Sequence, residues 1–165
     1  MKKGYTTIEL LMVIVIIGFF ASIVMPFFST TYDTFKIEGA YRQLMQDLRY
    51  AQQLAISRQV PHGISVDDVA DTYWVYRQNP SNIVKDPATQ KPLIVSYATG
   101  KFAGIQLVST TYNFPTERIE FDSLGAPLVG GTITLNYGGT LTRCGRVSGG
   151  ITRIINIESV TGRIY

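Results

Sequence analysis

Apolar residues cluster near the start of the chain in one almost unbroken run. Residues 10–28 (LLMVIVIIGFFASIVMPFF) contain a single polar side chain, that of Ser22. A helix needs about 20 mostly apolar residues to cross the hydrocarbon core of a bilayer, so this run predicts a membrane-spanning helix. The run is longer than the apolar region of a secretory signal peptide, and it ends in Met25-Pro26-Phe27-Phe28 instead of the small residues of a cleavage site. We therefore expect the helix to be retained.

After this run, apolar residues recur at spacings of three and four. They are Ile37, Tyr41, Leu44, Leu48, Ala51 and Ala55. This spacing predicts one apolar face of an amphipathic helix. Pro61 disfavours helical geometry at Val60, so the helix should end near residues 57–59. A continuous helix from Tyr5 to that end would be roughly 80 Å long.

The remainder of the chain has the pattern of short strands separated by turns. The candidate strands are His62–Val66, Tyr73–Arg77, Leu93–Tyr97, Gly104–Val108, Arg118–Phe121, Thr132–Asn136, Arg153–Glu158 and Arg163–Tyr165. Residues 79–92 contain three prolines and are expected to form a polar surface loop. The Gly130-Gly131, Gly138-Gly139 and Gly149-Gly150 pairs are expected to form hairpin turns. The predicted fold class is therefore α+β, a long N-terminal helix packed on an antiparallel sheet domain.

Glu9 is the one charged residue at the start of the apolar run. A carboxylate in hydrocarbon costs several kcal/mol unless it is paired or lies near the interface. Cleavage between Gly4 and Tyr5 would create an α-ammonium one helical turn away. In a packed filament, Glu9 would pair with the Tyr5 ammonium of a neighbour and set the axial register. The alternative is that Glu9 only caps the N-terminus of the helix, where the macrodipole favours a negative charge.

The N-terminal string Lys2-Lys3-Gly4-Tyr5-Thr6-Thr7-Ile8-Glu9-Leu10-Leu11 resembles the signal of type IV pilins and type II secretion pseudopilins. The resemblance implies that a membrane prepilin peptidase cuts after Gly4 and N-methylates Tyr5. It also makes Glu9 the assembly glutamate and Pro26 the proline that bends the helix. Lys2 and Lys3 favour a cytoplasmic leader, which would place the rest of the chain across the membrane.

Three further segments resemble the GspH/FimT family of minor pseudopilins and minor pilins. They are AYRQLMQDLRYAQQLAISRQVPHGISV, IEFDSLGAPL and TRIINIESVTGRIY. The resemblance implies a leader (1–4), a membrane or filament-core helix (5–28), its amphipathic continuation (29–60) and a β-rich periplasmic domain (61–165) with two sheets. It implies a structural subunit of a type II secretion pseudopilus. The implied partners are other pseudopilins or pilins, the prepilin peptidase, an inner-membrane assembly platform and membrane lipid. A type IV pilus minor pilin for pilus assembly or DNA uptake is the alternative.

Groups for catalysis or metal binding do not converge in the sequence. The single histidine, His62, follows Pro61 and is expected to lie on the surface or to make a local hydrogen bond. Cys144 has no second cysteine to complete a zinc site or a disulfide. The acidic cluster Asp67, Asp68 and Asp71 lacks the ligand spacing of a calcium loop and is expected to be a solvated turn. We predict no enzyme activity, no cofactor and no metal.

Charge bears on one open alternative, DNA binding. Removal of Lys2 and Lys3 from the 15 basic residues would leave 13 against 12 acidic ones, and this balance argues against nucleic-acid binding driven by bulk charge. After residue 140, however, Glu158 is the only acidic residue. Four arginines lie in the same segment: Arg143, Arg146, Arg153 and Arg163. Some pilus members of the family bind DNA through a Gly-Arg-x-Arg motif, but Gly145-Arg146-Val147-Ser148 lacks its second arginine. A solvated or subunit-contacting face is the default interpretation.

Overall fold

The computed structural model describes residues 5–111, 118–128, 130–138, 140–141, 147–148, 150–158 and 164. Within them, only the backbone is described for residues 24–31, 109–111, 140–141 and 147–148. The elements are α1 (Thr7–Arg58), β1 (His62–Asp67), β2 (Thr72–Arg77), β3 (Asn79–Ile83), β4 (Ile94–Ser96), η1 (Gly100–Phe102), β5 (Ile105–Thr111), β6 (Arg118–Phe121), β7 (Gly131–Tyr137), β8 (Thr140–Leu141), β9 (Val147–Ser148) and β10 (Ile151–Ile157). The chain divides into two compact units, Met1–Phe35 and Lys36–Tyr165, and α1 runs through both.

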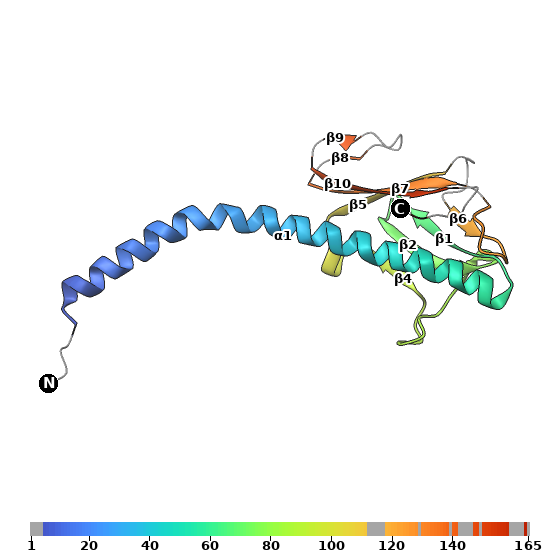
Figure 1. The fold of residues 1–165 in the computed structure, drawn as a ribbon, viewed down its shortest axis with the longest axis horizontal. Coiled ribbons are helices and arrows are strands. Elements are labelled where there is room, and N and C mark those ends of the chain that lie inside the picture. Colours follow the sequence, from blue (N-terminus) through green and yellow to red (C-terminus); the bar gives the residue numbers. More distant parts are fainter. Residues whose placement is uncertain are drawn as a thin grey trace. The chain divides into compact units, whose positions relative to one another are not determined.

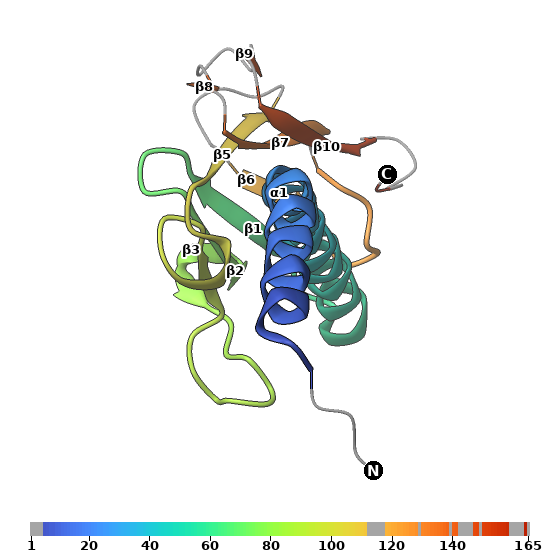
Figure 2. The same cartoon turned by 90° about the vertical axis from the view of Figure 1, so that its left-hand side faces the viewer.

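Among the described residues, the second unit contains two main antiparallel sheets, and β8 pairs with β9 in a separate two-stranded sheet. In the larger sheet the strand order is β3-β2-β1-β6, and β4 pairs with β2 as well. The smaller sheet has the order β10-β7-β5. The two sheets lie on different sides of the second half of α1 (Figures 1 and 2). A long helix packed on antiparallel sheets was the predicted architecture, and the two sheets match what the family resemblance implies.

The core of the second unit forms between the predicted face of α1 and the inner faces of the sheets. The buried helix residues are Ile37, Ala40, Leu44, Leu48, Ala51, Leu54 and Ala55, and Tyr41 is packed partly against them. The apolar periodicity is therefore confirmed. The helix ends at Arg58 as expected, and Gln59 follows in the left-handed conformation (φ 53°) that often terminates helices.

Three polar contacts fix α1 against the sheets. Tyr73 Oη donates a hydrogen bond to Asp47 Oδ2 at 2.7 Å, and Tyr97 Oη donates to the Ala40 carbonyl at 3.0 Å. Burial raises the pKa of the Asp47 carboxyl, although the bond from Tyr73 opposes this. Gln52 Nε2 donates to the carbonyl of Gly125 at 2.8 Å. These contacts join α1 to strand β2, to the chain after β4, and to the loop after β6.

Two details of the strand prediction are wrong. Residues 79–83, expected within a loop, form β3. Pro80 is tolerated there because β3 lies at the edge of its sheet, where a missing N–H breaks no internal ladder. Leu93–Tyr97 is also shortened, to β4. Of the candidate strand Arg163–Tyr165 only residue 164 is described, and Ile164 forms a bridge with Ile157.

The Gly130-Gly131 pair does not form the expected hairpin turn, and Gly139 and Gly149 of the other two pairs lie outside the described residues. Gly131 is the first residue of β7. Tyr137 pairs with Ile151 and Thr140 pairs with Ser148, so β8 and β9 continue the register of β7 and β10. Gly138 and Gly150 occupy matching positions where this long hairpin is interrupted, and their φ angles are 76° and 78°. Glycine suits the interruption because it enters the left-handed region at no steric cost.

Candidate functional site

The start of α1 is closed by a reciprocal capping interaction between Thr6 and Glu9. The backbone N–H and the hydroxyl of Thr6 both lie 3.3 Å from Glu9 Oε2, and the backbone N–H of Glu9 donates to Thr6 Oγ1 at 3.4 Å. This is a capping box, in which a threonine and a glutamate three residues later satisfy each other's backbone donors. The T-x-x-E spacing in the sequence was the signal for Thr6, a residue that sequence reasoning did not single out.

The capping geometry bears directly on the two alternatives for Glu9. The cap is present, so the carboxylate has partners within its own helix. Pairing with a neighbour's Tyr5 ammonium stays a prediction. Tyr5 itself is 90% exposed, and Gly4 lies outside the described residues.

The first unit presents large apolar side chains to solvent on every side of the helix. Among the described side chains from Ile8 to Ile23, each large apolar residue is between 48% and 73% exposed. A helix that is apolar all round is stable in a membrane or inside an assembly. Contiguous exposed apolar surface of this kind marks an interaction surface. The described part of the chain nevertheless includes no helix that meets the length and apolar content of a membrane span. Helix α1 continues through Pro26, and a kink there stays a prediction.

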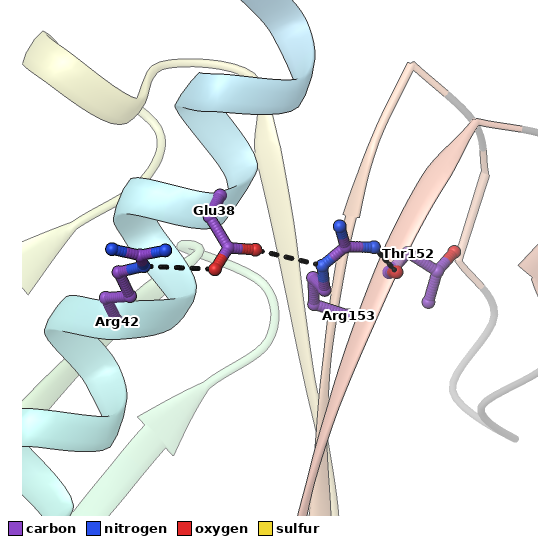
Figure 3. Close-up of polar contacts among 4 residues, drawn as sticks. All are labelled: Glu38, Arg42, Thr152 and Arg153. Carbon is purple, nitrogen blue, oxygen red and sulfur yellow. Dashed lines mark hydrogen bonds and ion pairs between the residues drawn. The ribbon is translucent and has the colours of Figure 1, made fainter.

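Four C-terminal arginines were named as possible DNA contacts, and of these only Arg153 lies within the described part of the chain. Its Nε donates to Glu38 Oε2 at 3.2 Å, and Arg42 Nε donates to Glu38 Oε1 at 3.0 Å (Figure 3). A second nitrogen of Arg153, Nη1, donates to the Thr152 carbonyl at 3.1 Å (Figure 3). The hydrogen bonds from Arg42 and then Arg153 hold the pKa of the Glu38 carboxyl below its ordinary value. Arg153 therefore joins β10 to α1.

Sequence reasoning missed Glu38 as the partner of Arg153. The available signal was the spacing of Glu38 and Arg42, which places opposite charges on one helix face. The contact from Glu38 to β10 depends on tertiary structure and could not be read from spacing. Arg143, Arg146, Arg163 and Cys144 lie outside the described residues.

His62 is buried and makes the local hydrogen bond that was expected as one alternative. Its Nδ1 lies 2.6 Å from the Val60 carbonyl, so this nitrogen is the donor, and within the described part of the chain Nε2 is buried without a partner. Burial lowers the pKa of His62, and the charges of Arg58 and Arg77 lower it further. Burial of the ring therefore disfavours its protonated form.

The acidic cluster forms the expected turn, with one additional role. Asp67 Oδ1 accepts hydrogen bonds from the backbone N–H groups of Val69 and Ala70, each at 3.0 Å. Asp71 Oδ1 instead accepts from the Leu107 N–H at 2.9 Å, which ties this turn to β5 of the other sheet. Burial raises the pKa of Asp71. Among the described residues, no group of three His, Cys, Asp or Glu side chains is placed to hold a metal ion.

One family model matches most of the second unit of this chain. Residues 40–151 match the family described as "Type II transport protein GspH". Competence protein ComGD of Bacillus subtilis is 28% identical over 132 residues, which cover 80% of this chain and 78% of that protein.

Two solved structures share the fold. The minor pseudopilin EpsH of the type 2 secretion system of Vibrio cholerae has a TM-score of 0.57 at 11% identity, covering 79% of this chain and 94% of EpsH. The type IV minor pilin FimU of Pseudomonas aeruginosa has a TM-score of 0.50 at 16% identity, covering 78% of this chain and 85% of FimU. The family match spans well over half of the chain, so this protein belongs to the GspH family and is a pilin-like structural subunit, not an enzyme.

Proposed function

We propose that this chain is a minor pseudopilin of a type II secretion system, a structural subunit of the pseudopilus. In this proposal, residues 1–4 are a leader that is removed. Residues 5–28 hold the subunit in the inner membrane and later lie in the filament core, residues 29–60 continue the helix, and residues 61–165 form the periplasmic domain. The name of EpsH, a minor pseudopilin of a type 2 secretion system, supports this choice.

The observation that carries the proposal is the apolar surface from Ile8 to Ile23, which has a single carboxylate, that of Glu9. Side chains from Ile8 to Ile23 that are roughly half exposed or more would aggregate in water unless lipid or other helices covered them. Glu9 stands at the start of this surface and would be costly there without a counter-charge. A new ammonium on Tyr5 of an adjacent subunit would supply that charge. The proposed partners are accordingly membrane lipid first, and then other pseudopilins.

Processing at Gly4 gives the first test. Gly4 offers no side chain to obstruct an extended substrate in a protease cleft, so Gly4→Leu should leave an uncut precursor that does not co-sediment with the filament. The measurement is the size of the protein in an immunoblot of cells that express the peptidase. Gly18→Ala is the matched control, because a methyl group at Gly18 meets nothing within 4 Å, and this variant should be cut normally. Normal-sized mature protein from Gly4→Leu would refute the leader assignment.

A second candidate is a minor pilin that takes part in DNA uptake, and the description of ComGD as a competence protein favours it. Arg146 and Arg153 allow a test by gel shift of the full chain in detergent. DNA capture predicts a shift at low salt that weakens with added salt, and that weakens again in Arg146→Gln. Arg153→Gln is less direct, since Arg153 also binds Glu38. Absence of any shift at low salt would exclude this candidate.

A further inference from the structure

A polar hollow lies at the end of the second unit where α1 stops. Its volume is about 370 Å³, and it is open to solvent. The walls come from three separate parts of the chain: the last turns of α1, the end of β2, and β3 with the loop that follows it. Three of the lining residues are cationic: Arg58, Arg77 and Lys85. None of the lining residues is acidic.

We propose that this hollow binds a phosphate group. Two arginines and one lysine around one space suit a tetrahedral dianion, because guanidinium groups donate paired hydrogen bonds to phosphate oxygens and an ammonium adds a point charge. The Asn82 and Gln90 amides and the Tyr50 hydroxyl line the same hollow and supply further polar groups. Arg153 does not line this hollow, and the proposal does not depend on the proposed function.

The three cations have no acidic partner within the described part of the chain. Asp86 follows Lys85 in the sequence but does not line the hollow. Its carboxylate instead accepts hydrogen bonds from Thr89 Oγ1 at 2.7 Å and the Ala88 N–H at 3.0 Å. Arg58 also complements the dipole at the end of α1, but Arg77 and Lys85 lie on other elements and have no such role.

The fold itself brings Arg58 and Arg77 together. Arg77 is the last residue of β2 and pairs in register with His62, the first residue of β1. Only residues 59–61 separate His62 from Arg58 at the end of α1. Both arginines lie close enough to the buried His62 ring for their charges to lower its pKa, after the larger effect of burial. An anion in the hollow would relieve the repulsion between these cations.

Calorimetric titration of the full chain in a neutral detergent, at low ionic strength, tests the proposal. Inorganic phosphate should bind saturably with a Kd in roughly the millimolar range, because the site is exposed and screened. In the double variant Arg58→Gln/Arg77→Gln, affinity should fall by about tenfold or more. Arg49→Gln is the matched control, an exposed arginine on the same helix but outside the hollow, and it should bind as the wild type does. Lys85→Gln provides a milder variant if the double variant fails to fold.

A short oligonucleotide serves as a second ligand and distinguishes free phosphate from a phosphodiester. Binding of both ligands that is lost in the double variant assigns the hollow to a nucleic-acid backbone, and loss of phosphate alone assigns it to small phosphates. The proposal is overturned if the wild type shows no saturable phosphate binding. It is also overturned if the double variant, or Lys85→Gln in its place, binds phosphate as tightly as Arg49→Gln does.

Discussion

Replacing Glu9 by glutamine is expected to leave membrane insertion and cleavage intact but to lower the amount of subunit in the filament by about tenfold or more. Glutamine can replace glutamate in a capping box, so the interaction with Thr6 should survive. The negative charge is lost, and the Tyr5 ammonium of a neighbouring subunit would lie among apolar helices without a counter-charge. Removing one partner of a buried ion pair typically costs about 3–5 kcal/mol. The measurement is the fraction of mature subunit that co-sediments with sheared filaments.

Thr6→Val is the complementary variant to Glu9→Gln, because it disrupts the capping box and leaves the charge of Glu9 in place. It removes the hydroxyl that contacts Glu9 but keeps the carboxylate. We expect filament content close to that of the wild type, because the pairing charge remains. Glu9→Leu removes both functions and should behave like Glu9→Gln. If Glu9→Gln assembles normally while Thr6→Val and Glu9→Leu do not, then capping alone explains Glu9 and the pairing proposal fails.

Gly63→Ala should produce the largest loss of stability of any single methyl group added to the larger sheet. Gly63 lies in β1, the strand between β2 and β6, and is in register with Tyr76 on one side and Glu120 on the other. A Cβ there would lie 2.3 Å from the Ile119 carbonyl oxygen and 2.8 Å from Tyr76 Oη. The first of these atoms belongs to the backbone and cannot move aside without distorting the sheet. We expect the free energy of unfolding to fall by about 3 kcal/mol.

The structure explains why glycine stands at this position. The Tyr76 ring crosses the space that a side chain at 63 would fill, and its hydroxyl donates a hydrogen bond to Glu120 Oε2 at 3.1 Å. An aromatic residue that covers a glycine on the adjacent strand is a known device for pinning register. The single phenol therefore joins β2 to β6 across β1.

Trp74, the only tryptophan, lies on β2, so its fluorescence can be used to measure the stability of the Gly63→Ala variant. Its indole N–H donates to the Pro80 carbonyl at 2.9 Å, so its fluorescence should report loss of the larger sheet during unfolding in urea. Gly39→Ala is the matched control. A methyl group there would meet Phe102 at an ordinary 3.4 Å, and alanine favours the helix by about 1 kcal/mol relative to glycine. Equal stability losses in the two variants would contradict the steric argument.

The amphipathic part of α1 was predictable because its signal is repeated. Each of several turns places an apolar residue on the same face, and this repetition agrees with the buried set from Ile37 to Ala55. The end of the helix was equally clear, since Pro61 restricts the residue before it. These signals are local, and the fold did not override them.

The errors come from places where a local signal depends on tertiary position. Pro80 is typical of a turn and led to the prediction of a loop, but a proline at the edge of a sheet can belong to a strand. Gly138 reads as a turn glycine, but it interrupts a hairpin whose register continues beyond it. The pairing of Glu38 with Arg153 spans 115 residues, and no spacing rule links them. The hollow lined by Arg58, Arg77 and Lys85 could not be predicted either, because its residues come from parts of the chain that only the fold brings together.

The proposed membrane and assembly roles depend on the chemistry of the first unit. Its apolar exposure was implicit in residues 10–28, and the T-x-x-E pattern encodes the cap. What the cap does not provide is a counter-charge for Glu9. In our account this charge comes from the amino group that cleavage creates on Tyr5.

The mass of the N-terminal peptide of the natural protein, isolated from cells, tests this account most directly. We predict that the chain begins at Tyr5 and carries one added methyl group on its amino nitrogen. A chain that still begins at Met1 would contradict the account, because no ammonium would then stand one helical turn from Glu9.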